Sequence, residues 1–525
     1  MKKIIFYLSL FILANSTFAQ NDTTFNRVYY KSSGTTGYTN LLEHNDYYYA
    51  TIVKVDTPSL HQCFGIEKIN KNGTIVDSNM WCINNIGVVV YNGHPFTITS
   101  ENKFLIACIT KKESDGEIIG MLTKIDENLD TIWTRWFHHP DTAIADTINP
   151  SKITMGLSDV KQALDGNYII TGNYNKNCDG NVNRSFLMKT DTSGNIIWFR
   201  YMPANIIASN VIYDIENDPV DSGFYFPSAR SVTSPQLISL FKTDQQGNVL
   251  WYTQVNHTPS PNYQQHPVDA EVINDSTVII ASAKQWISNP YGLSVVVASV
   301  NTKNHSLNWE KNYSFDNEMK DPSLHQSIGV NLTYNNNIAI SSTMLIKYPN
   351  LHFGSRGTIL LINQNGDSLW QRFYAHEPSD SSNIGLQLND LIPTKDGGFL
   401  FCGTYNDNYE MWKHAWLVKT DSMGYAPCTY TLAIEEKQLL IKVVQPVLYP
   451  NPAVNDISLR FEDSQNKNIE LTIYSSTGAL VKQQLLTGYS NEYRINIQDL
   501  STGVYVVKLV SDNKIIYSSK FIKQK

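Results

Sequence analysis

The sequence predicts an all-β protein built from one repeated unit of four strands and followed by a smaller β domain. Three observations support this: a two-part phrase that recurs seven times, the strand-forming composition of both parts, and a change of pattern near residue 430. The second part of the phrase is centred on Asn70, Asp126, Asp191, Asp244, Asn301, Asn363 and Asp421, at steps of 53 to 65 residues. Repeats of this length, made of strands and turns, indicate a ring or stack of small sheets.

The second part of the phrase predicts a hairpin. Its clearest copy begins at Lys189-Thr190-Asp191 and ends at Trp198. An Asp at the start of a turn bonds to nearby backbone N–H groups, and a glycine such as Gly194 tolerates the positive φ that the turn requires. We therefore expect a tight turn with one strand on each side.

The first part predicts a buried strand. In the clearest copies, Asp165-Gly166-Asn167 precedes Tyr168–Gly172, and Asp396-Gly397-Gly398 precedes Phe399–Gly403. A polar turn followed by consecutive aromatic and β-branched residues is typical of a strand that is buried on both faces. Together with a leading strand and the hairpin, this strand completes four strands in each copy.

Seven copies of a four-stranded sheet predict a seven-bladed β-propeller over residues 20–430. A large aromatic ring recurs at one hairpin position and is expected to seal each blade against the next. These rings belong to Trp133, Trp198, Trp251, Trp309 and Trp370. The seventh copy lacks the strand after its turn, and Phe25-Asn26-Arg27-Val28-Tyr29 fits the missing pattern. We therefore expect residues 24–30 to complete the last blade and to remove an exposed sheet edge.

The first residues predict a secretory signal peptide over residues 1–19. Two lysines precede an apolar run that ends in Thr17-Phe18-Ala19, so cleavage is expected between Ala19 and Gln20. No later stretch is long and apolar enough to span a bilayer, so we expect no transmembrane segment in the mature chain.

A second domain is predicted over residues 448–525, after a linker over residues 431–447. Short β runs at Ile457–Phe461, Ile469–Tyr474 and Val504–Leu509 are separated by turns. About 75 residues of short strands indicate a small, Ig-like β-sandwich.

This second domain also carries a family resemblance. Its motifs are Tyr449-Pro450-Asn451-Pro452 at the opening, Gly503-Val504-Tyr505 in the middle and Lys520-Phe521-Ile522-Lys523 near the end. They resemble the C-terminal type A sorting domain of type IX secretion in the Bacteroidota. The resemblance implies that the type IX machinery is a partner, and that the cargo crosses the periplasm and the outer membrane to be released or attached to the cell surface. The repeats resemble those of other secreted proteins of these bacteria.

Composition excludes some classes of function. Charged residues are 17% of the chain, the formal net charge is -7 and no Lys/Arg run occurs, which argues against a nucleic-acid ligand. The chain contains no Gly-x-Ser-x-Gly elbow, no His-Glu-x-x-His and no phosphate-binding glycine loop. We therefore expect no cofactor, and enzymatic activity is less favoured than binding.

Histidines after the Trp strands are candidate metal ligands. His138, His139 and Asp141 follow one such strand, and His257 and His376 follow two others. Loops after equivalent strands emerge on the same face of a ring, where histidines with acidic neighbours could hold a metal. The alternative is that these residues are exposed loop positions inherited with the repeat.

Two cysteines in the first copy are a candidate disulfide. Asn72-Gly73 is the preferred dipeptide of a two-residue hairpin turn. Counting outward from it sets Lys71 opposite Thr74 and Cys63 opposite Cys82, close enough for a bond between adjacent strands.

Three functions remain open from the sequence. The favoured one is an exported binding module whose variable loops recognise an unidentified glycan or protein. The second is a hydrolase or lyase that acts on polysaccharide or peptide with carboxylates at the channel mouth. The third is a structural part of a surface layer, which needs no pocket.

Overall fold

The computed structural model of the chain forms two compact units, Met1–Leu432 and Ala433–Lys525. The structure describes residues 24–30, 34–55, 62–82, 86–89, 95–112, 118–138, 153–176, 183–202, 212, 214–230, 237–255, 263–286, 293–314, 328–347, 353–376, 385–406, 413–426, 447–465, 469–476, 479–486, 490–511 and 514–524. The predicted signal peptide, with Ala19 and Gln20, lies outside these ranges, as does the predicted linker up to residue 446.

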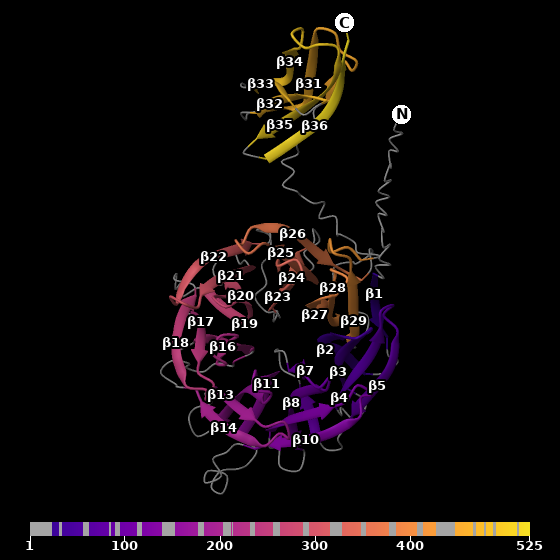
Figure 1. Cartoon of the computed structure of the whole chain (residues 1–525). Helices are drawn as coiled ribbons and strands as arrows, with labels where there is room; N and C mark the ends of the chain where they lie inside the picture. The colour runs from indigo at the N-terminus through magenta and orange to yellow at the C-terminus, as the bar shows by residue number, and fades with distance from the viewer. Residues whose placement is uncertain are drawn as a thin grey trace, which may run out of the picture. The chain divides into compact units, whose positions relative to one another are not determined.

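Every regular element in the described ranges is a strand. The first unit holds five four-stranded sheets and one nine-stranded sheet. Figure 1 shows these sheets following one another around a ring, with one edge strand of most sheets toward the centre and the opposite edge strand on the outside. No helix in the described part of the chain is long and apolar enough to cross a membrane. The prediction of an all-β chain of repeated four-stranded sheets is confirmed.

The sheets of the first unit follow chain order, with β1 joining the last. The first sheet contains β2 (Thr35–His44), β3 (Tyr47–Val55), β4 (Gln62–Asn70) and β5 (Ile75–Trp81). The nine-stranded sheet contains β6 (Ile86–Val89), β7 (Phe96–Ile98), β8 (Phe104–Lys112), β9 (Ile118–Ile125), β10 (Thr131–Phe137), β11 (Ile153–Gln162), β12 (Tyr168–Lys176), β13 (Asn183–Thr190) and β14 (Ile196–Tyr201). The next contain β15 (Glu216–Asn217), β16 (Phe224–Arg230), β17 (Leu237–Thr243) and β18 (Val249–Val255), and then β19 (Tyr263–Asn274), β20 (Thr277–Trp286), β21 (Leu293–Asn301) and β22 (Ser306–Ser314). The last two contain β23 (Ile328–Leu332), β24 (Ile338–Lys347), β25 (Phe353–Ile362) and β26 (Ser368–Tyr374), and then β27 (Gly385–Pro393), β28 (Phe399–Asn406), β29 (Lys413–Thr420) and β1 (Phe25–Tyr29).

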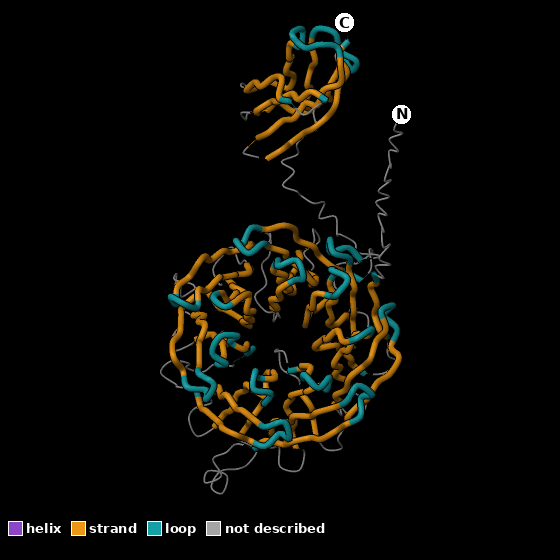
Figure 2. The backbone as a smooth tube through the Cα atoms, in the orientation of Figure 1, coloured by secondary structure: helices purple, strands orange, loops and turns teal. Residues whose placement is uncertain are grey.

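The nine-stranded sheet corresponds to two successive copies of the repeat. Its two parts, β6–β10 and β11–β14, are joined through a single parallel pair, Thr154 with Ile118. Within each part the strands run antiparallel, as they do in the other sheets. Figure 2 shows the same layered arrangement around the ring, with short turns between neighbouring strands.

The hairpin turn has the predicted chemistry. The Asp191 carboxylate accepts hydrogen bonds from the backbone N–H groups of Ser193 and Asn195, at 2.9 and 2.8 Å. Gly194 has a φ of 81°. The same bonds recur at Asp244 and Asp421, so the phrase encodes one local structure wherever it appears in these copies.

The lysine that begins the phrase forms a buried ion pair within its own sheet. Lys189 lies 2.7 Å from the carboxylate of Asp165, in the turn that precedes the buried strand. Lys419 lies 2.7 Å from Asp396 in the equivalent place, and its side chain is fully buried. The lysine stems fill space inside the sheet interface, and the paired carboxylate offsets the cost of burying the charge.

The recurring tryptophans pack onto the next sheet. A Cβ at Gly247 would lie 2.6 Å from the ring of Trp198, which belongs to the preceding sheet. Equivalent contacts join Trp309 to Gly366 and Trp370 to Gly424 of the next sheet, and Trp133 to Gly194 between the two parts of the nine-stranded sheet. Trp251 instead stacks on His305, with ring centroids 4.3 Å apart.

The N-terminal strand lies beside the last sheet. β1 pairs antiparallel with β29, with Phe25 opposite Lys419. The Phe25 ring contacts Gly73 of the first sheet as a tryptophan does elsewhere, and the Tyr29 hydroxyl donates to the Gly73 carbonyl at 2.6 Å. The first and last sheets also share one hydrophobic cluster, which includes Tyr38 and Leu417.

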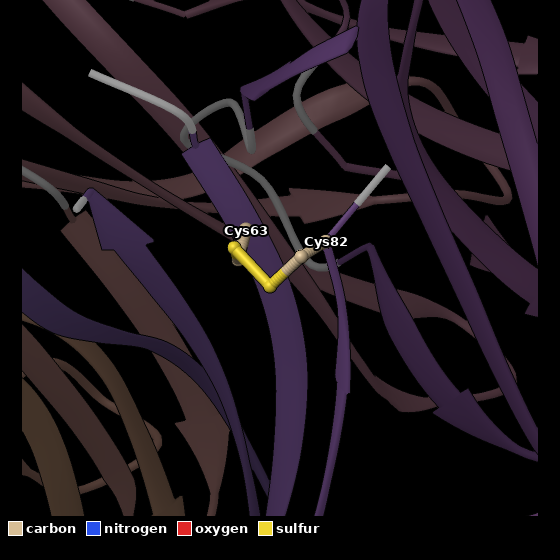
Figure 3. Close-up of a disulfide and its surroundings, with 2 residues drawn as sticks. All are labelled: Cys63 and Cys82. Carbon is tan, nitrogen blue, oxygen red and sulfur yellow. A yellow bond between two sulfur atoms is a disulfide. The ribbon is translucent and has the colours of Figure 1, made fainter. Parts of the chain in front are cut away.

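Cys63 and Cys82 form a disulfide between β4 and the end of β5, with Cα atoms 4.4 Å apart (Figure 3). The predicted pairing of Lys71 with Thr74 is wrong, because the backbone N–H of Asn70 donates to the Thr74 carbonyl instead, at 2.9 Å.

A register shift after Lys68 compensates for this longer turn. Beyond the shift, Lys68 lies opposite Asp77 and Phe64 lies opposite Trp81. The bulge therefore restores the register that a two-residue turn would have produced, and the two cysteines face each other.

The second unit is a sandwich of two sheets around one core. One sheet contains β30 (Val447–Tyr449), β31 (Asp456–Gln465) and β34 (Ser490–Asn496); the other contains β33 (Leu480–Leu486), β32 (Ile469–Ser475), β35 (Gly503–Ser511) and β36 (Lys514–Lys523). Buried residues of both sheets, among them Ile457 and Val507, belong to the same hydrophobic cluster.

The opening motif of the second unit is bound to its last strand. The Asn451 side chain donates to the Lys520 carbonyl at 3.1 Å and accepts from the Ile522 N–H at 3.0 Å. The peptide bonds that precede Pro450 and Pro452 are cis. The middle motif reaches the same strand: the Tyr505 ring, two residues after Gly503, stacks on Phe521. The Tyr449 hydroxyl donates to Glu492 at 2.7 Å.

Candidate functional site in the channel

A repeated aspartate on the innermost strands connects neighbouring sheets. Asp159 accepts from the backbone N–H of Ile215 on the next sheet at 2.9 Å. Asp214 does the same for Ala270 at 3.2 Å, Asp269 for Val330 at 2.6 Å, and Asp390 for Leu41 at 2.7 Å. These four carboxylates are at most 3% exposed. Hydrogen bonds from backbone N–H groups to a carboxylate are charge-assisted, so these aspartates hold the innermost strands of neighbouring sheets together. We call the place of this aspartate in each copy the frame position.

The residue two positions after the frame position lines the channel in every copy. These residues are Leu42, Thr97, Lys161, Glu216, Glu271, Asn331 and Ile392. All of them line one cavity of about 180 Å³, together with frame residues and their immediate neighbours. The frame aspartate recurs in four copies, whereas the channel position ranges from Leu42 and Ile392 on one side of the wall to Lys161, Glu216 and Glu271 on the polar side.

Lys161 and Glu216 form an ion pair across two sheets on the polar side. The Lys161 ammonium contacts the Glu216 carboxylate and lies 3.3 Å from Asp214. Burial alone would lower the pKa of Lys161, but the carboxylates of Asp214 and Glu216 outweigh it and hold this pKa well above its usual range. Lys161 is therefore a permanent cation in the channel wall.

The two glutamates have raised pKa values. Burial raises the pKa of Glu216 to about 7, although the neighbouring Lys161 ammonium opposes the shift. Burial and the nearby Glu216 carboxylate raise the pKa of Glu271 well above its usual range. A carboxyl group that keeps its proton near neutral pH can donate a hydrogen bond as well as accept one. The polar side therefore offers the Lys161 ammonium, the Asn331 amide and the carboxyl groups of Glu216 and Glu271 to a ligand.

The predicted metal ligands are only partly described. His138 is exposed at the end of β10, and His376 is half-buried after β26 with its ring 5.2 Å from that of Tyr405. His139, Asp141 and His257 lie outside the described residues. Within the described part of the chain, no group of three or more His, Cys, Asp or Glu residues is arranged to hold a metal ion.

Sequence reasoning did not single out the channel residues. A usable signal was present, because Asp159, Asp214 and Asp269 stand 55 residues apart in succession. Single aspartates in strands with little other similarity are hard to recognise as a repeat, and the channel position itself varies in chemistry. Because the residue type at the channel position varies between copies, a search for repeated residues does not find this position.

Comparison with known proteins identifies the second unit. Residues 447–524 match the family described as a secretion system C-terminal sorting domain. The chain is therefore a cargo of type IX secretion, exported and then secreted or attached to the cell surface. No protein sequence of curated function matches the chain.

Solved structures resemble the chain only distantly. The β-propeller domain of the Trilobed protease from Pyrococcus furiosus has 8% identity and a TM-score of 0.39, covering 76% of this chain and 99% of its own. An α-L-arabinanase from Penicillium chrysogenum, complexed with arabinobiose, has 7% identity and a TM-score of 0.41, and the match covers 62% of this chain and 92% of the arabinanase chain. A Trypanosoma rangeli sialidase in complex with sialic acid has 9% identity and a TM-score of 0.38, and the match covers 95% of this chain and 86% of the sialidase chain. At these values, none of the three identifies a ligand or an activity of this chain.

Proposed function

We propose that the chain is an exported binding module: a seven-bladed propeller with its ligand site in the channel, delivered by an Ig-like sorting domain. The nine-stranded sheet then counts as two blades, and β1 closes the ring as the outer strand of the seventh. The ligand is an unidentified glycan or protein that inserts a small polar group into the channel.

One observation carries this proposal. The frame position is an aspartate in four copies, whereas the channel position two residues later is different in kind around the ring. Residues needed only to hold the ring together would be expected to repeat, as the frame does. A wall with Leu42 and Ile392 on one side and Lys161, Glu216 and Glu271 on the other instead suits an asymmetric ligand.

The test is a binding screen of the exported chain against glycan and peptide arrays. The wild type is compared with the double variant E216Q/E271Q and with D130N, which changes an exposed carboxylate in the hairpin between β9 and β10. We expect at least one class of ligand to bind, and E216Q/E271Q alone to weaken that binding about tenfold or more, which is about 1.4 kcal/mol. Ligand binding that both variants leave unchanged would remove the channel from the proposal, and absence of any ligand would favour a structural surface-layer role.

A catalytic role is the second candidate, because the pKa of Glu216 is raised to about 7 beside a second carboxyl group. A carboxyl that is protonated near the working pH can act as a general acid, with the other carboxylate as its partner. Release of reducing ends or free amines, assayed alongside binding, distinguishes the two. Turnover that E216Q abolishes while binding persists would establish an enzyme.

A further inference from the structure

One position of the repeat is a lysine in five copies and an uncharged residue in the other two. It is the residue opposite the tryptophan position, and it reads Lys68, Lys124, Lys189, Lys242, Ser299, Leu361 and Lys419 along the chain. In four copies the lysine pairs with a carboxylate of its own sheet. In the sixth copy Leu361 is a buried apolar side chain. The fifth copy alone has a small residue there.

A cavity of about 200 Å³ lies where that lysine side chain would be. It is lined by Ser299, by Asn274 and Thr277 at the turn before the buried strand, and by Asn308 and Trp309 on β22. The next sheet closes it with Ile338, Gln364 and Asn365. Where the phrase is intact, the Lys189 ammonium lies 5.7 Å from the ring of Phe224, the first residue of β16. In the fifth copy both groups are smaller. Ser299 stands in place of the lysine, and Ile338, the first residue of β24, stands in place of the phenylalanine.

The cavity wall carries no charge and combines apolar side chains with amide and hydroxyl groups. None of its ten lining residues is ionisable, and amide or hydroxyl groups come from both sheets. The residue before the tryptophan is Ile132, Ile197, Leu250 or Leu369 in other copies, but here it is Asn308, whose amide donates to the Ser299 hydroxyl at 3.1 Å. Two neighbouring positions have therefore changed together from the repeat residue to a small or polar one.

The tryptophan of this copy forms a fixed apolar wall. Its indole N–H donates to the Gln364 carbonyl at 3.0 Å, which ties the ring to the next sheet. Its ring also packs against Gly366 of that sheet. The ring orientation is therefore set before any ligand arrives, and its electron-rich face can receive C–H groups.

We propose that this cavity, between the β19–β22 and β23–β26 sheets, binds one neutral sugar ring. Its volume of about 200 Å³ is enough for one ring and too small to enclose an extended oligosaccharide. Sugar hydroxyls both donate and accept, as the surrounding amides and hydroxyls do, while the C–H face of the ring suits Trp309. A charged sugar would bury its charge without a partner among the lining residues, which is costly.

This proposal goes beyond the binding function in the channel, because the two cavities share no lining residue and the two proposals can fail independently. The experiment titrates the exported chain with free glucose, galactose, mannose, rhamnose and N-acetylglucosamine by saturation-transfer NMR. At least one of these sugars should bind saturably, with a Kd on the order of 1 mM as expected for one ring. Glucosamine and glucuronic acid should bind at least about tenfold more weakly.

Two variants use residues that the chain itself carries at the equivalent positions. S299K refills the cavity and should abolish binding, and N308L should weaken it about tenfold, while the exposed-turn control D130N leaves it unchanged. Thermal unfolding of each variant checks the fold, and N308L remains informative if S299K fails to fold. The proposal is overturned if no neutral sugar saturates, if charged sugars bind equally well, or if binding survives both cavity variants.

Discussion

The outer hairpins and the inner strands of the ring use repetition differently. At the hairpins nearly everything repeats: the lysine and its carboxylate, the aspartate turn, the positive-φ glycine and the aromatic ring packed on it. On the inner strands only the frame aspartate recurs, and the channel position changes from copy to copy. The difference teaches that repeated residues hold the ring, while varied residues are available for ligands.

Breaking a repeated ion pair should have the largest effect. D396A leaves the ammonium of Lys419 buried without its carboxylate, and we expect a loss of about 3–5 kcal/mol in the free energy of unfolding. Chemical denaturation of D396A and of D130N, a control at an exposed turn, measures the difference. A loss below about 1 kcal/mol would mean that water reaches Lys419 and that the repeated pair does not hold the sheet.

The first copy is a variation within the repeated region, because Asp77 occupies its tryptophan position. The Cys63–Cys82 disulfide ties the same two strands. Closing a loop of this length is expected to stabilise the fold by about 3 kcal/mol. The double variant C63S/C82S should lose about that much in denaturant unfolding. Alkylation of both cysteines in the unreduced, unfolded wild type, read by mass spectrometry, would show that the bond does not form.

The glycine–tryptophan contact can be separated from the cost of a positive φ. Gly166 and Gly247 have φ of 84° and 78°, but only Gly247 has a tryptophan ring against it. G166A should cost about 1 kcal/mol from backbone strain, whereas G247A should cost about 2 kcal/mol more, because Trp198 must move. Thermal unfolding compares the two. Equal losses would show that the rings adapt and do not seal the sheets tightly.

Replacing the channel residue Glu271 should have the smallest effect on the free energy of unfolding. The change should be a gain in stability, whereas the three preceding variants lose stability. The raised pKa of Glu271 means that the folded chain holds this proton more tightly than the unfolded chain does. Stability should therefore fall as pH rises above the ordinary glutamate range and through the raised pKa of Glu271. E271Q removes this cost, so it should be more stable than the wild type at about pH 8, by denaturant unfolding. If E271Q is less stable than the wild type both at about pH 5 and at about pH 8, Glu271 helps to hold the ring together, as the frame aspartates do.

Sequence reasoning worked best where a residue acts through its own neighbours. The Asp191 turn and the buried strand Tyr168–Gly172 depend on short-range bonds and on hydrophobicity over a few residues, both of which can be read directly. It failed in detail at Asn72-Gly73, because the preferred dipeptide lies in a longer turn closed by Asn70 and Thr74. A bulge then returned the strands to the expected register, which no local rule would show.

The sequence by itself determined the repeated four-stranded unit and the sorting domain, because turn chemistry, strand pattern and motif order are local properties of the chain. Only the tertiary structure decided which residues meet in the channel and where a missing lysine leaves a cavity. Lys161, Glu216 and Glu271 are about 55 residues apart in turn, and the walls of the cavity at Ser299 come from two sheets. Such neighbours are brought together by the packing of sheet on sheet around the ring, which depends on contacts along the whole first unit.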